Sequence, residues 1–132
     1  MQITDLNKTR FEKAIRARSI DDIIAYINKG LSVNTESEGI HIFDAVLSSD
    51  KPHTKEALDL ILSHPNWNPN YSTVDSLRPE ERAMLHHREE VAIRVIQHPN
   101  FDKKAYPRVI RSAERFQADK VIQFFADQSY TR

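Results

Sequence analysis

The chain of 132 residues contains no cysteine and only two glycines, Gly30 and Gly39. Without cysteine there is no disulfide framework and no thiolate chemistry. Two isolated glycines cannot form the glycine-rich loop that holds nucleotide phosphates. These absences exclude thiol enzymes and most nucleotide-dependent enzymes.

An excess of one charge and long apolar runs are also missing. Lysine plus arginine and aspartate plus glutamate number 19 each, so nothing draws the whole chain toward nucleic acid or acidic membranes. No apolar stretch approaches the roughly 20 residues of a membrane-spanning helix. The segment from Met1 to Asp5 lacks the basic and apolar blocks of a secretory signal. We therefore expect a cytoplasmic protein that makes no membrane contact.

The chain does have the composition of a folded domain. Hydrophobic residues make up 39% and charged residues 29%, which are ordinary values for a globular protein. The length is sufficient for one hydrophobic core without disulfides or metal. We predict a single domain over residues 1–132.

An internal repeat is the strongest positive signal. The segment SHPNWN at 63–68 recurs as QHPNFD at 97–102, a shift of 34 residues, and Val33-Asn34 matches the end of both. Repeats of this length indicate a stacked array in which each unit covers the core face of the next. The preceding helices carry apolar residues at equivalent places, namely Ile23, Ala57 and Val91, then Ile24, Leu58 and Ala92, then Ile27, Ile61 and Val95.

Each unit is predicted to contain one clear amphipathic helix. Ser19 is expected to cap the first and Gly30 to end it in a left-handed conformation. Thr54 is expected to cap the second, and Pro65 and Pro99 to end the second and third. A last copy is expected to bury Ala118, Val121, Ile122 and Phe125.

A shorter helix is predicted ahead of each of these. A capping box at Thr9–Glu12 opens the first, and Pro107 suits the first position of the last. The third unit is less regular, because Glu80 falls where the second unit has Val46. Its first helix is expected to start near Pro79. The buried residues of these helices are predicted to be Phe11, Ala14, Ile15, Ile42, Phe43, Val46, Leu47, Ala83, Met84, Val109, Ile110 and Ala113.

These units resemble ankyrin repeats. Phe11–Ile15 is similar to the inner helix of that family, Ser19–Gly30 to its outer helix, and Leu31–Asn34 to the end of its repeat. The resemblance covers residues 3 to about 102, and more weakly to 127. It implies an all-α solenoid of about four stacked helix-turn-helix repeats, at approximately 3–34, 35–68, 69–102 and 103–132.

The chain departs from the family pattern at two points. The Thr-Pro-Leu-His tetrapeptide is absent, and the second and third units carry His-Pro-Asn in place of Gly-Ala-Asp. A tetratricopeptide array has a similar period. The long polar stretches at 31–41 and 66–76 favour instead the projecting finger loops of an ankyrin stack.

Neither a metal site nor an active site can be assembled from the sequence. Glu80-Glu81 and Glu89-Glu90 each lie at an expected helix start, where acidic residues favour the positive end of the helix dipole. No serine lies in a nucleophile elbow, and no acid, base and nucleophile set is present. The histidines lack ligand spacing; they are His41, His53, His64, His86, His87 and His98. We expect no cofactor, no metal and no catalysis.

Basic residues and finger loops are the candidate binding surfaces. Arg10, Lys13, Arg16 and Arg18 fall on the exposed side of the first inner helix, and Arg108, Arg111 and Arg115 form a second cluster. Such clusters suit an acidic partner, although a solvated polar face is the ordinary alternative. Tyr71 suits a protein interface or, alternatively, covers the edge of the core, whereas Trp67 is expected to be buried. The candidate partner-binding residues are Arg10, Lys13, Arg16, His41, Tyr71, Thr73, Lys103, Lys104, Arg108 and Arg111.

The resemblance implies protein–protein recognition without cofactors. Because the chain is small, we expect a stand-alone inhibitor, immunity or anti-defence protein that occludes a macromolecular partner. The alternatives are a nucleic-acid-binding protein that uses the basic clusters, a small enzyme, and a self-associating chain or piece of a larger protein.

Overall fold

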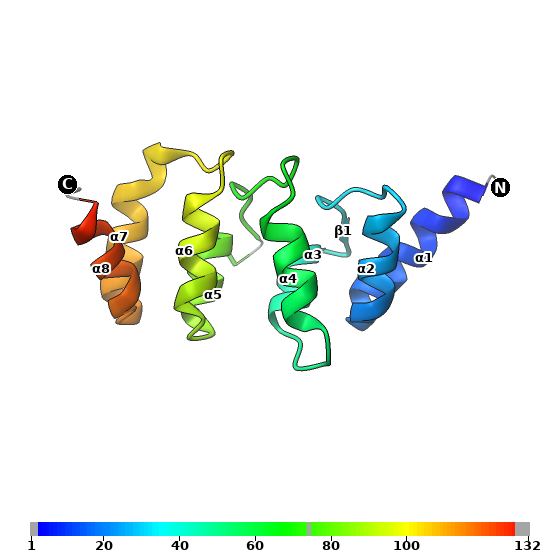
Figure 1. Ribbon diagram of the computed structural model, residues 1–132, viewed down its shortest axis with the longest axis horizontal. Helices are drawn as coiled ribbons and strands as arrows, with labels where there is room; N and C mark the ends of the chain where they lie inside the picture. Colours follow the sequence, from blue (N-terminus) through cyan, green and yellow to red (C-terminus); the bar gives the residue numbers. More distant parts are fainter. Residues whose placement is uncertain (1–2, 74, 129–132) are drawn as a thin grey trace. The chain divides into compact units, whose positions relative to one another are not determined.

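The computed structural model describes residues 3–73 and 75–128, with side chains from Leu6 onward. In this part the chain is mostly helical, with eight α-helices and one two-stranded sheet (Figure 1). This confirms the helical class. The backbone divides into two compact units, residues 1–67 and 68–132. Their association into a single domain stays a prediction.

Unit one consists of two helical hairpins and a short β-hairpin between them. Helix α1 packs on α2, α3 packs on α4, and each helix also contacts its equivalent in the other hairpin. The elements are α1 (Ile3–Ala17), α2 (Ile20–Asn28), β1 (Glu36–Ser37), β2 (Ile40–His41), α3 (Ile42–Leu47) and α4 (Thr54–Leu62). Strands β1 and β2 are antiparallel, with Glu36 opposite His41.

Unit two repeats the arrangement with two further hairpins. Helices α5 and α6 pack together, as do α7 and α8, while α5 contacts α7 and α6 contacts α8. The elements are α5 (Pro79–Leu85), α6 (Glu89–Gln97), a 3₁₀ turn η1 (Lys103–Ala105), α7 (Tyr106–Phe116) and α8 (Asp119–Asp127). Within each unit, therefore, first helices contact first helices and second helices contact second helices.

The core contains the apolar residues that recur at the 34-residue interval. Ile27, Ile61 and Val95 are all buried. Trp67 is also buried, and its ring centroid lies 5.1 Å from that of Phe43. The residues aligned with it, Val33 and Phe101, are buried as well. The predicted burial of these positions is confirmed. Among the other positions predicted to be buried, Ile24 and Val91 are only half-buried, and Ile122 is 38% exposed.

The predicted helix ends are confirmed in part. Gly30 has a φ of +98°, and its N–H donates to Ile27 O while that of Leu31 donates to Tyr26 O. These two hydrogen bonds form a Schellman motif. The motif favours glycine at this position because φ is positive. Ser19 stands at the N-cap of α2, but its side chain makes no capping hydrogen bond.

Two predicted helix starts are wrong. Helix α1 begins at Ile3, so Thr9 lies inside it and opens nothing. No helix breaker stands between Ile3 and Thr9, so the helix continues toward the N-terminus. Thr54 is the first residue of α4, and His53, in a left-handed conformation, stands at the cap. The Thr54 hydroxyl instead donates to Lys51 O at 2.6 Å.

Two first helices are also longer than expected. Helix α1 has 15 residues and α7 has 11, whereas the second helices of all four hairpins have nine. Only α3 and α5 are the shorter members of their hairpins. Pro107 is the second residue of α7 and not the first. Its missing N–H is harmless at this position too, because the first N–H groups of a helix have no intrahelical partner.

Asparagine side chains join successive loops within each unit. Asn34 Nδ2 donates to Asn66 O at 2.8 Å in unit one, and Asn70 Nδ2 donates to Asn100 O at 2.7 Å in unit two. His64 and His98 each accept the backbone N–H two residues later on Nδ1. The two histidines therefore make the equivalent helix-end contacts that their spacing predicts.

Candidate functional site

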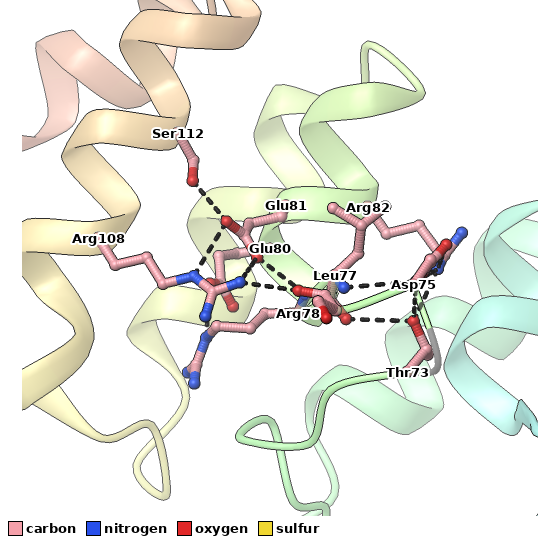
Figure 2. A network of polar contacts seen from close by, with 10 residues as sticks. Thr73, Asp75, Leu77, Arg78, Glu80, Glu81, Arg82, Arg108 and Ser112 are labelled. Atoms are coloured by element: carbon pink, nitrogen blue, oxygen red, sulfur yellow. Dashed lines mark hydrogen bonds and ion pairs between the residues drawn. The ribbon is translucent and has the colours of Figure 1, made fainter.

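A network of charged side chains joins helices α5 and α7 in unit two (Figure 2). It begins at the N-terminus of α5, where the Glu81 carboxylate accepts the backbone N–H of Arg78 at 3.0 Å. This contact turns the side chain of Glu81, the third residue of α5, back over the first turn of the helix. It places Glu81 facing α7.

Glu81 is the centre of the network. Arg108 approaches it with two nitrogens, Nη2 at 2.8 Å and Nε at 3.2 Å, and the Ser112 hydroxyl donates to the same carboxylate. Burial acts to raise the pKa of Glu81, but the hydrogen bonds from Arg108 and Ser112 outweigh it and hold the pKa below its ordinary value. The same pair raises the pKa of Arg108. Glu81 is therefore a fixed anion that holds α7 against α5.

Glu80, beside it, has the opposite environment. Its side chain is fully buried, and Oε2 accepts from Arg78 Nε at 2.8 Å, while Oε1 has no hydrogen-bond partner in the described part of the chain. Burial raises the pKa of Glu80, although the Arg78 charge works against it. The Arg78 guanidinium in turn lies over the Phe101 ring at 5.4 Å.

Asp75 forms the third part of the network, in the loop before α5. Arg82 Nη2 donates to both carboxylate oxygens, at 2.7 and 2.8 Å, and the hydroxyl of Thr73 donates to one of them. The Thr73 and Arg82 hydrogen bonds lower the pKa of Asp75 to about 2. Asp75 therefore ties the end of the finger loop to α5.

We predict that the Asp75 contribution to stability disappears in acid. Because the folded pKa of Asp75 lies near 2 and the ordinary value is 3.8, its stabilisation is complete above pH 4 and is lost as pH falls toward 2. The difference in unfolding free energy between wild type and Asp75→Asn should shrink over this range. Urea unfolding at a series of pH values measures it; a difference that is constant from pH 6 to about pH 2 would contradict the ionic role of Asp75.

A pocket of about 410 Å³ lies next to this network. Its charged lining consists of Asp75, Glu81, Arg108, Arg111 and Arg115. The two carboxylates are already paired, with Arg82 and Arg108 respectively. Arg111 makes no hydrogen bond or ion pair with any described residue, and Arg115 lies only over the Phe116 ring at 4.6 Å. The pocket therefore has positive charge that no described residue neutralises.

The candidate residues of unit one lie on α1 and at the β-hairpin. Arg10 and Lys13 are exposed on α1. Arg16 Nη1 donates to the Ser37 hydroxyl at 2.6 Å, and His41 Nε2 lies 3.3 Å from a carboxylate oxygen of Glu36. Arg16 and His41 are thus held by the hairpin, while Arg10 and Lys13 project from the helix.

Arg18 does not share the helical face that its spacing predicts. It follows the end of α1 with a φ of +53°, and its Nε donates to the Ser48 hydroxyl at 2.9 Å. The helix has already ended at Ala17, so the 3.6-residue period no longer sets its direction.

The candidate residues of unit two divide into held and exposed groups. Tyr71 and Thr73 are half-buried in the finger loop, and the Thr73 hydroxyl donates a hydrogen bond to Asp75. Arg108 is exposed but paired with Glu81. The exposed cations without an ion pair among the described residues are Lys103 and Lys104 on η1 and Arg111 on α7. The structure thus brings Arg108 and Arg111 together at one pocket, which the other candidates do not line.

Sequence reasoning missed the contacts of this network. Glu81 was interpreted only as an acid at a helix start, and Ser112 and Asp75 were not candidates, because these contacts join residues 27 to 31 positions apart or lie in an irregular loop. One signal was present: Glu80 and Glu81 occupy the places that Val46 and Leu47, both buried, have one repeat earlier. Two consecutive acids at core positions predict buried partners of opposite charge.

Comparisons of the chain with protein-family models, with curated proteins and with solved structures find no match. In the described part of the chain, no helix is both long enough and apolar enough to cross a membrane. The same residues contain no group of three or more histidine, aspartate or glutamate side chains arranged to hold a metal ion.

Proposed function

We propose that this chain is a non-catalytic protein-binding module built from ankyrin-like helical hairpins. In this proposal four hairpins stack in a row, and the partner docks on the first helices and the finger loops. The equivalent burial of Ile27, Ile61 and Val95, together with the packing of like helices within each unit, supports the repeat arrangement.

One observation carries the binding role. In each unit one first helix, α1 or α7, is buried on one side and presents on the other side cations that pair with no described residue. On α1, Phe11 and Ile15 are fully buried, while Arg10 and Lys13 are exposed and without a partner among the described residues. On α7, Val109 is fully buried and Arg111 is exposed and unpaired. Cations fixed on packed helices form a preorganised surface for an acidic protein.

The direct test is capture of a partner from the cells that make the protein. Tagged wild type is expected to retain one protein in stoichiometric amount, and Arg10→Gln combined with Lys13→Gln or with Arg111→Gln is expected to weaken that capture. A tagged chain that folds, by circular dichroism, and captures no such protein would argue against the module.

Nucleic acid is the competing partner for the same cations. A gel shift at several salt concentrations separates the two, because binding through phosphates weakens steeply as salt rises. The balance of 19 basic and 19 acidic residues favours the protein partner. A narrower form of the proposal is that binding occludes the partner, as an inhibitor, immunity or anti-defence protein does; it expects the captured protein to lose its own activity in the complex.

A further inference from the structure

We infer that the pocket on α7 takes an extended acidic peptide segment of the partner, with two carboxylate side chains separated by one residue. The inference rests on the proposed protein-binding function and names the chemistry that one surface recognises. Two side chains, Arg111 and Arg115, would each bind one carboxylate.

The charge of the pocket favours an anionic ligand. Glu81 and Asp75 are each matched by one arginine, so these pairs add no net charge. Arg111 and Arg115 remain, both exposed and neither in an ion pair among the described residues. The pocket is therefore left with two positive charges, which two carboxylates would neutralise.

The distance between the two arginines matches an extended peptide. Arg111 and Arg115 are four residues apart on α7, so they lie on one face with Cβ atoms about 5–6 Å apart. Residues i and i+2 of an extended peptide point to the same side and are about 6.6 Å apart. An acidic-x-acidic segment that lies along α7 matches this distance, whereas adjacent acids point to opposite sides.

Inorganic phosphate is the competing anion for the same two arginines. The Glu81 carboxylate is already neutralised by Arg108, so it does not decide between phosphate and carboxylates. The titration below therefore compares phosphate with the peptide directly.

The frame that holds the site is fixed independently of the ligand. Arg108 is bound to Glu81 and also donates to Ser76 O at 2.8 Å, so the start of α7 is tied to α5 and to the loop before it. Arg111 and Arg115 lie one and two turns further along the same helix face as Arg108. The two free guanidinium groups are consequently presented from a fixed helix.

The test uses fluorescence anisotropy with a labelled peptide that is uncharged except for one Glu-Ser-Glu segment. Wild type is expected to bind it at low ionic strength and more weakly at about 0.15 M salt, where charges are screened beyond about 8 Å. Arg111→Gln/Arg115→Gln is expected to raise Kd by about tenfold or more, since two charge-assisted contacts are removed. The matched control, Lys55→Gln/Lys120→Gln, removes the same charge elsewhere and should bind within about twofold of wild type.

Two further peptides test the recognition. A Gln-Ser-Gln peptide should bind at least about tenfold more weakly, because it carries no charge. A peptide with two adjacent glutamates should also bind more weakly than Glu-Ser-Glu. Several results would overturn the inference: no binding of Glu-Ser-Glu below about 1 mM, equal binding of the glutamine peptide, equal loss in both double variants, or tighter binding of inorganic phosphate than of the peptide.

Capture from cells separates this inference from the proposed function. If Arg111→Gln/Arg115→Gln retains the natural partner as wild type does, the pocket inference fails and the binding module stands. If wild type captures no partner, the module fails, while the peptide titration still measures the pocket. Both arginines are exposed, so the variant should keep the circular dichroism and urea midpoint of wild type.

Discussion

Replacing Glu81 by glutamine is expected to lower the free energy of unfolding by about 3 kcal/mol. Its carboxylate accepts from Arg78 N, from two nitrogens of Arg108 and from the Ser112 hydroxyl. The side-chain amide of glutamine has nearly the same size but only one acceptor oxygen. Its NH₂ group therefore faces donors at either end of the site. The loss comprises two or more hydrogen bonds and the ion pair with Arg108.

The matched control is the same substitution at the preceding residue. Glu80 uses only Oε2, and burial raises the pKa of its carboxyl. A raised folded pKa means that the protonated, uncharged carboxyl favours folding. This contribution is present below the ordinary pKa of 4.5 and is lost as pH rises through the folded pKa. Glu80→Gln can keep the bond from Arg78 while removing a buried charge. We expect it to unfold within about 1 kcal/mol of wild type at neutral pH.

Urea unfolding followed by circular dichroism compares the two variants, and hydrogen exchange of the α5 and α7 amides locates the effect. Glu81→Gln should raise exchange in both helices. Equal losses for both variants would show that general disturbance of the α5 start, rather than the pairing with Arg108, determines stability. A Glu81→Gln variant as stable as wild type would remove the network as the link between α5 and α7.

The packing of the hairpins could be predicted from the sequence because its signal is local and repeated. Apolar residues at helical spacing identify a buried face within one segment, and the 34-residue interval supplies the same information several times. Ile27, Ile61 and Val95 are buried as this signal predicts. Helix starts were harder, because His53 takes a left-handed conformation that its residue type does not require.

The candidate site could be predicted only in part. Arg108 and Arg111 were identified as exposed cations on a helix face, and the structure places both at the pocket. The difference between them arises from Glu81, which neutralises Arg108 from another helix. Sequence spacing along α7 carries no information about that partner. The distinction between a structural and a free arginine therefore required the fold.

Replacing Trp67 by alanine is expected to lower the free energy of unfolding by about 3–5 kcal/mol, the usual cost of a large buried aromatic. The ring is 1% exposed and contacts Phe43 of helix α3. Its removal leaves a cavity next to Phe43. The backbone N–H of Trp67 also donates to His64 O at 3.2 Å, which fixes the chain as it leaves α4. The cavity cannot close without moving that turn.

Two substitutions calibrate the Trp67 result in urea unfolding followed by circular dichroism. Trp67→Phe should cost less than Trp67→Ala, because Phe101 is buried at the equivalent place of the next repeat. Ile122→Ala removes a large apolar side chain that is 38% exposed, and its cost should stay below about 1.5 kcal/mol. If Trp67→Ala is as mild as Ile122→Ala, the packing of Trp67 on Phe43 does not fix the turn that follows α4.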